Sequence, residues 1–338
     1  RDYYASRGLG DVYKRQEEIQ YSAPGKRAKD IRETLELATL VADSAGEIAR
    51  IEEAAKEKGI HVSIGLRIHP SFGFAGGRGE PSKFGIDEEE AITLLNDWHF
   101  PHLSPAGIHV HLKSQELSEE ALALYYENVL LMAERLGRTE AMELSFVNLG
   151  SGIGIPMDPE DEEMDLALLE KAFAALAGPF HDRFPKARLF LESGRYAPGP
   201  SGFYVTKALD RKVSEGKVFL ITAGTMHGFL RPALARLVEK YDETGHPALC
   251  EPLFSGARAF PISTLREGNP ETVTITGNLC TAADIIAEDI TLPRLAEGDG
   301  IVIGNAGAYA ATLSPFAFSS LERPKEFLLK ETGDLEGV

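Results

Sequence analysis

The chain has 338 residues, 43% of them hydrophobic and 26% charged, so it has enough apolar side chains to build a core and is not intrinsically disordered. Its 35 Lys and Arg residues against 52 Asp and Glu residues give a net charge of −17, which argues against binding of nucleic acid or anionic lipid. No apolar stretch is long enough to cross a bilayer, and two cysteines (Cys250 and Cys280) cannot form a disulfide framework, so we expect a cytoplasmic protein.

The first segment, residues 1–16, has no regular hydrophobic period and lacks the apolar core of a signal peptide. We expect it to be a remnant of expression or translation rather than part of the fold. The folded part is then expected to begin at Glu17, part-way into a domain.

From Glu17 onward, short apolar runs alternate with amphipathic stretches, which is typical of β-α units around a parallel sheet. The predicted strands are residues 18–22, 40–43, 61–68, 105–112, 146–149 and 188–192. The predicted helices are residues 31–39, 44–59, 87–95, 117–136 and 166–184. Residues 71–84 form a long loop with four glycines, of the sort that carries functional sites.

The pattern changes after Gly199. Apolar runs suited to strands follow, separated by turns rather than by regular helices, at residues 203–210, 217–222, 272–276 and 300–304. We therefore place a domain boundary near residues 210–215 and expect the remainder to be dominated by β-structure.

A glycine-rich segment, Gly150-Ser151-Gly152-Ile153-Gly154, follows an apolar strand. Glycine lets the backbone approach an anion closely, and successive N–H groups can then bind a phosphate. A tight turn without a ligand is the alternative. The segment does not open a helix in the dinucleotide-binding pattern, because Pro156 and an acidic run follow it, so hydride transfer is disfavoured.

Two further groups lie at or near strand ends. Glu192 and Arg195 come at the carboxyl end of a predicted strand, where they could contact two ends of one cofactor or simply form a surface salt bridge. His109 and His111 would point to the same side of a strand, which suits a metal or a stacked ring. No acidic residue or cysteine neighbours them at zinc spacing, so we expect no metal site and expect one histidine to be a hydrogen-bonded core residue.

In chain order, these motifs resemble the fold-type III pyridoxal-phosphate-dependent amino-acid decarboxylases, the family of diaminopimelate, ornithine and arginine decarboxylases. The resemblance covers residues 17–329 and rests on Ser82-Lys83-Phe84-Gly85, His109 to Gln115, Asn148 to Gly152, Glu192 to Arg195, Met226 to Leu234, the segment around Cys280, and Gly307-Ala308-Tyr309. It implies an α/β fold: an alanine-racemase-like (β/α)8 barrel, incomplete at its N-terminus, over residues 17–211, and a C-terminal β-rich domain over residues 212–338.

The resemblance also implies that pyridoxal 5'-phosphate is the cofactor and that the protein is a carboxy-lyase. His111 would stack on the cofactor ring, and Glu192 would pair with the pyridine nitrogen. The remaining cofactor contacts implied are Ser114, Gly150, Ser151, Gly152, Gly194, Arg195 and Tyr309.

The substrate side follows from the same resemblance. Cys280 would be the acid that protonates the product, reaching in from the partner subunit of a homodimer with shared active sites. Arg195 and Tyr309 would contact the substrate carboxylate, and Arg231 a distal carboxylate. Thr281 stands where relatives carry an acid that binds a distal ammonium. The expected substrate is therefore an amino acid with a carboxylate-bearing or conjugated distal end.

One expected feature of the family is missing. The Schiff-base lysine belongs to a first strand with a Tyr-Ala-x-Lys-like motif, and neither Lys26 nor Lys83 matches it. The resemblance thus implies an N-terminally truncated member with impaired activity. A catalytically dead homologue acting as a binding or regulatory protein is the alternative. An amino-acid racemase is the weaker third hypothesis, because the Cys280 segment is decarboxylase-like.

Overall fold

The computed structural model describes residues 19–157, 160–224, 226–242 and 257–338. Backbone contacts divide these residues into two compact units. The first comprises the residues up to Gly154 together with Met164–Ser193, and the second comprises Ile155–Glu163 and Gly194–Val338. The expectation for residues 1–16 and the prediction for Cys250 lie outside the described residues.

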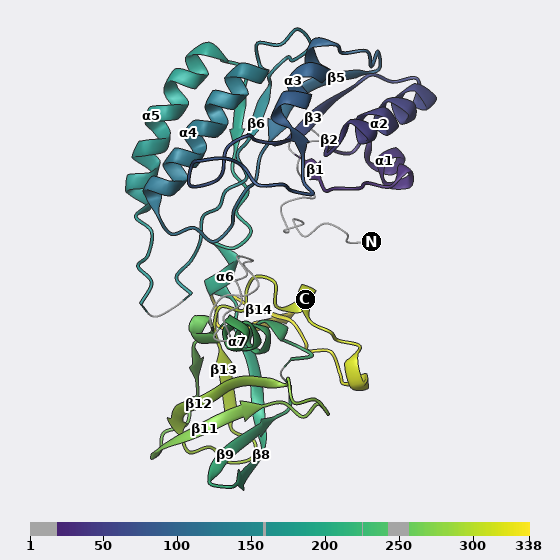
Figure 1. Ribbon diagram of the computed structural model, residues 1–338. Helices are drawn as coiled ribbons and strands as arrows, with labels where there is room; N and C mark the ends of the chain where they lie inside the picture. The colour runs from purple at the N-terminus through teal and green to yellow at the C-terminus, as the bar shows by residue number, and fades with distance from the viewer. Residues whose placement is uncertain (1–18, 158–159, 225, 243–256) are drawn as a thin grey trace. The chain divides into compact units, whose positions relative to one another are not determined.

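The first unit is a parallel sheet connected by helices (Figure 1). Its strand order is β1 (Gln20–Ser22), β2 (Thr39–Ala42), β3 (Val62–His69), β5 (Leu103–His109), β6 (Phe146–Asn148) and β7 (Arg188–Phe190), with β4 (Ile86–Asp87) pairing with β3. Its helices are α1 (Ala28–Thr34), α2 (Ala45–Lys58), α3 (Glu88–Asn96), α4 (Glu119–Leu136) and α5 (Leu166–Arg183). The α/β class is confirmed, and β1 and β7 are the edges of this sheet in the described chain.

Local sequence explains where these elements begin and end. The Ser44 side chain accepts the N–H of Glu47 at the start of α2, and Gly59 ends that helix in a left-handed conformation (φ 65°). Ser118 and Asp165 cap α4 and α5 in the same way. Because the strands are buried on both faces, they consist mainly of apolar residues, as expected for a parallel sheet.

The centre of the sheet is packed by an aromatic ring over glycines. Gly65 and Gly107 are register partners on β3 and β5, and Gly107 is in turn the partner of Phe146 on β6. A Cβ atom on Gly107 would lie only 2.4 Å from the Phe146 ring, so glycine is required there for the ring to pack.

The second unit contains a mixed sheet with the strand order β10-β13-β8-β9-β11-β12. These strands are β8 (Tyr204–Ser214), β9 (Lys217–Thr222), β10 (Ile262–Ser263), β11 (Pro270–Thr276), β12 (Ile285–Pro293) and β13 (Gly300–Ile303). The unit also contains α6 (Pro198–Ser201), α7 (Leu230–Asp242) and a hairpin of β14 (Phe327–Leu329) and β15 (Leu335–Gly337). The β-rich character of this region is confirmed.

Three details differ from the sequence predictions. The division between the units falls at Gly194, whereas the predicted boundary after Arg211 lies inside β8, which pairs with its neighbours over its whole length. The expectation that this region lacks regular helices is wrong, because α7 is an amphipathic helix whose Pro232 lies in its first turn. Five of the described strands were not predicted, namely β4, β10, β12, β14 and β15. Within the described residues, no helix has an apolar stretch long enough to span a membrane.

Candidate active site

A row of polar side chains crosses the carboxyl edge of the parallel sheet. Arg67 on β3 is the register partner of His109 on β5, and His109 is the partner of Asn148 on β6. All three residues are buried. Asn148 pairs in turn with Phe190 on β7, and Glu192 follows two residues later. Parallel strands present their carboxyl ends at one edge, which is where ligands bind in α/β folds.

Glu192 is held at this edge by a neutral amide. Asn148 Nδ2 donates to Glu192 Oε1 at 2.8 Å, and the Glu192 N–H donates to the carbonyl of Gly150 at 2.5 Å. The other carboxylate oxygen lies 3.6 Å from His109 Nε2, and the side chain remains 49% exposed. The carboxylate is therefore fixed in place yet accessible.

The glycine turn, defined as Gly150, Ser151 and Gly152, begins two residues after β6. Gly150 and Gly152 have φ values of 62° and 85°, and a Cβ atom on Gly150 would lie 2.5 Å from His111 Nδ1. The Gly150 N–H donates to Asn148 Oδ1 at 2.9 Å. Because this N–H already has an acceptor, the N–H groups of Ser151 and Gly152 are the candidates for binding an anion.

The two histidines are buried in different settings. His109 Nδ1 contacts Ser22 Oγ at 2.7 Å, whereas His111 lies two residues past β5 with its Nε2 2.9 Å from Ser114 Oγ. His109 Nε2 and His111 Nδ1 have no hydrogen-bond partner among the described residues. Burial, followed by the charge of Arg67, lowers the pKa of His111 and brings that of His109 to about 3. Both rings are therefore neutral near pH 7, and the His109–Glu192 contact is not an ion pair.

Two charged residues that we did not predict complete the row. Arg67 Nη1 lies 3.6 Å from Asp43 Oδ1, and its guanidinium lies 4.2 Å from the centre of the Phe84 ring. Asp43 Oδ2 accepts the N–H of Gly85 at 3.1 Å, which ties the Ser82–Gly85 motif to the sheet edge. The sequence signal that could have identified Arg67 and Asp43 is a charged residue within or just after an apolar strand.

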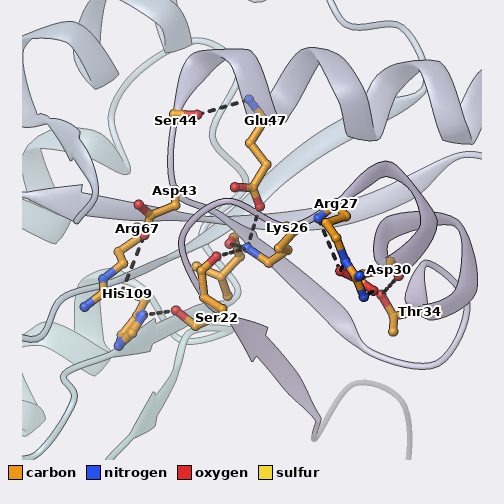
Figure 2. Close-up of polar contacts among 12 residues, drawn as sticks. Ser22, Lys26, Arg27, Asp30, Thr34, Asp43, Ser44, Glu47, Arg67 and His109 are labelled. Carbon is orange, nitrogen blue, oxygen red and sulfur yellow. Dashed lines mark hydrogen bonds and ion pairs between the residues drawn. The ribbon is translucent and has the colours of Figure 1, made fainter. Parts of the chain in front are cut away.

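Lys26 lies next to this row in a closed setting (Figure 2). Its ammonium donates to Glu47 Oε1 at 2.5 Å and to the carbonyls of Val41 and Ala23 at 2.6 and 2.8 Å. The Lys26 and Glu47 side chains are 0% and 1% exposed. Burial lowers the pKa of Lys26, and the hydrogen bond to Glu47 opposes that shift. Its three acceptors make Lys26 a structural residue of this unit.

The neutral state of His109 predicts a pH dependence of stability. Its pKa is 6.5 in the unfolded chain and about 3 in the folded one, so only the unfolded state takes up this proton between those values. We expect His109 to lower the free energy of unfolding by up to about 1.4 kcal/mol per pH unit as the pH falls from 6.5 to 3. Urea unfolding at several pH values gives the free energy of unfolding as a function of pH, and its slope should be shallower for His109→Asn than for the wild-type protein. The exposed His99→Asn control should keep the wild-type slope; equal slopes for all three proteins would contradict this account.

In the second unit, several residues that we predicted to contact the cofactor or the substrate lie close together. Gly194 and Arg195 lie beside Tyr309, with the Arg195 guanidinium 5.4 Å from the centre of the tyrosine ring. Tyr309 has a φ of 60°, in the left-handed region. Buried Arg231 donates from Nη1 to the carbonyl of Ala308 at 3.1 Å, and burial lowers its pKa to about 10. The structure thus brings Gly194, Arg195, Arg231 and Tyr309 together around one turn.

The acidic residue near Cys280 in the sequence, Asp284, is buried. Cys280 is exposed, and Thr281 Oγ1 accepts the N–H of Ala283 at 3.3 Å. The buried Asp284 carboxylate accepts the N–H groups of Leu279 and Met226 at 3.0 and 3.1 Å. Among the described residues, no group of three or more His, Cys, Asp or Glu side chains is arranged to hold a metal.

Residues 9–199 match the family model of the pyridoxal-binding domain of pyridoxal-dependent decarboxylases. The chain belongs to this family. It is 29% identical to L-glutamyl-[BtrI acyl-carrier protein] decarboxylase of Niallia circulans, over 95% of this chain and 74% of that protein. It is 31% identical to diaminopimelate decarboxylase of Methanothermobacter thermautotrophicus, over 86% of this chain and 64% of that protein. The chain therefore spans less than two thirds of the latter relative.

The fold comparison agrees with the family assignment. The structure of Helicobacter pylori diaminopimelate decarboxylase in complex with L-lysine matches 95% of this chain and 75% of its own, with a TM-score of 0.76 and 25% identity. The predicted family, the fold class and the cofactor of the family, pyridoxal phosphate, are thus confirmed. By family, the protein is a pyridoxal-dependent carboxy-lyase.

The residues at the sheet edge fit this cofactor. A half-exposed carboxylate at Glu192 suits a protonated pyridine nitrogen, and the left-handed glycine turn suits a phosphate. The buried Nδ1 of His111 lies next to Gly150 and has no hydrogen-bond partner in the described chain.

Proposed function

We propose that this protein decarboxylates an amino acid with pyridoxal phosphate as cofactor. The observation that carries the proposal is the Glu192 carboxylate, fixed by Asn148 at the same sheet edge as the glycine turn. When bound, pyridoxal phosphate supplies the electron sink that stabilises the negative charge left by departing CO2. The protein's part is to bind and orient the cofactor and to move the proton that replaces the carboxyl group.

Each residue then has an assigned task. Glu192 would keep the ring nitrogen protonated through a charge-assisted hydrogen bond. His111, oriented by Ser114, would lie against the ring. The N–H groups of Ser151 and Gly152 would bind the phosphate, with Gly150 shaping the turn. In the second unit we assign Gly194, Arg195 and Tyr309 to anionic groups of cofactor and substrate, and Cys280 to proton donation.

We further propose that the distal end of the substrate carries no free ammonium. Thr281 provides no charge, and the Asp284 carboxylate, three residues later, is buried and already accepts two N–H groups. A distal ammonium would therefore find no carboxylate on this loop. Buried Arg231 adds a positive charge to the same unit, which favours a carboxylate-bearing or conjugated distal end. The Niallia circulans relative is named for a glutamyl group attached to a carrier protein.

CO2 release tests the substrate class. In a variant that also carries a family-type first strand with the Schiff-base lysine, we expect kcat/KM to be at least about tenfold higher for an amino acid whose distal end is in amide or thioester linkage than for diaminopimelate. Thr281→Glu in the same background should reverse this preference by supplying a charge for the ammonium, and Thr281→Gln is the neutral control. Preference of the lysine-bearing protein for diaminopimelate would contradict the proposal. Cofactor binding without CO2 release from any substrate would favour the alternative, a homologue that acts by binding.

We also propose that the protein works in the cytoplasm as a homodimer in which Cys280 of the partner subunit completes each active site. The exposed position of Cys280 supports this proposal. Light scattering should give twice the chain mass of 36.8 kDa. A monomer that retains full activity would contradict the proposed homodimer with shared active sites.

A further inference from the structure

We propose that Asn148 is a positioning residue that couples the two ends of the cofactor site. Its single amide group holds the Glu192 carboxylate on one side and the glycine turn on the other. This inference rests on the proposed function, because it assigns the ring nitrogen to Glu192 and the phosphate to the turn.

The hydrogen bonds of Asn148 fix the orientation of its amide. Nδ2 donates to Glu192 Oε1 at 2.8 Å and to Gln20 Oε1 at 2.6 Å, while Oδ1 accepts the Gly150 N–H at 2.9 Å. Both amide hydrogens are therefore used. A flipped amide would place its oxygen against the Glu192 carboxylate and its NH2 group against the Gly150 N–H. Asn148 is only 2% exposed, so water cannot replace these contacts.

The charges around Glu192 explain why a neutral donor suits this position. Arg67 interacts electrostatically with Glu192, His109 is neutral, and buried Tyr125 adds no charge near pH 7. A second cation bonded to Glu192 would compete with a protonated ring nitrogen for the carboxylate. An amide fixes one carboxylate oxygen without neutralising its charge, which leaves the other oxygen for the cofactor.

A double-mutant cycle on cofactor affinity tests this coupling. We expect Asn148→Leu and Glu192→Gln each to weaken pyridoxal phosphate binding about tenfold or more. The loss of affinity in the double variant should be at least about fivefold smaller than the product of the two single losses. The reason is that Glu192 is no longer held in place once Asn148 is replaced. Ser145→Ala removes a hydrogen bond to Ala106 from the chain just before β6 and should leave affinity unchanged. Effects that multiply independently would overturn the inference.

The isosteric variant Asn148→Asp adds a pH signature that a packing role would not produce. The introduced carboxyl group would lie against Glu192, so the pair should share a proton and titrate with a raised apparent pKa. In its protonated form, the introduced side chain can still donate to Glu192. We therefore expect the cofactor affinity of the variant to approach the wild-type value at low pH and to fall as the pH rises. A ratio of variant to wild-type affinity that does not change with pH would contradict the inference.

A readout on the cofactor-free protein separates this inference from the proposed function. The Gly150 N–H should lose hydrogen-exchange protection in Asn148→Leu but keep it in Ser145→Ala, as measured by NMR. Unchanged protection in Asn148→Leu would overturn the inference whatever the cofactor does. A wild-type protein that fails to bind pyridoxal phosphate would contradict the proposed function instead.

Discussion

Glu192→Gln will weaken pyridoxal phosphate binding by about 10- to 100-fold, because a neutral amide replaces the carboxylate of a charge-assisted hydrogen bond. The substitution should disturb the fold little. The Glu192 side chain is 49% exposed, and a glutamine oxygen can still accept from Asn148. Fluorescence titration of the cofactor-free protein with pyridoxal phosphate measures the change, and thermal unfolding checks the fold.

The matched control is another carboxylate of the same unit. Glu52 accepts from the ring and the N–H of His102, far from the glycine turn in sequence, and it has no assigned part in cofactor binding. Glu52→Gln should therefore leave the affinity unchanged. Wild-type affinity in Glu192→Gln would remove the main support for the proposed function.

Lys26→Met should destabilise the protein by about 3–5 kcal/mol, the usual result of leaving one charge of a buried pair without its partner. Glu47 would then keep its carboxylate in a fully buried position, where it also lacks a partner for Oε2 among the described residues. The carbonyls of Val41 and Ala23 would lose a donor as well. Urea unfolding measures this change in the free energy of unfolding, provided that the variant and the wild-type protein have the same m-value.

Removing both charges should restore much of this loss. Lys26→Met combined with Glu47→Leu replaces the pair with apolar groups, so its free energy of unfolding should exceed that of Lys26→Met alone. The exposed pair Lys29–Glu33 provides the control, since Lys29→Met should change stability by less than about 1 kcal/mol. A Lys26→Met protein as stable as the Lys29→Met one would contradict the structural role of Lys26.

The regular part of the fold could be predicted because its signals are local. A helix over 44–59 was expected and Ala45–Lys58 is observed, since a cap, an apolar face and a terminal glycine all lie within that segment. The glycine turn and Glu192 could be proposed from the sequence because each lies within two residues of the end of an apolar strand, and the structure places both at the sheet edge.

What sequence reasoning missed depends on partners that are distant along the chain. Arg67 and Asp43 are single charged residues in apolar surroundings, and only the pairing of neighbouring strands shows that they meet. Gln20 lies 128 positions before Asn148, so their hydrogen bond could not be inferred from spacing. The sequence pattern changes after Gly199, close to the division at Gly194, but only the pairing of β8 with its neighbours shows that residues 210–215 lie inside the second unit.

The most direct test of the central claim is a crystal structure of the protein grown with pyridoxal phosphate. We predict that the pyridine nitrogen will lie within hydrogen-bonding distance of the Glu192 carboxylate and that the phosphate will accept the N–H groups of Ser151 and Gly152. A cofactor bound with its ring nitrogen away from Glu192, or at any place other than the carboxyl edge of the parallel sheet, would contradict the account.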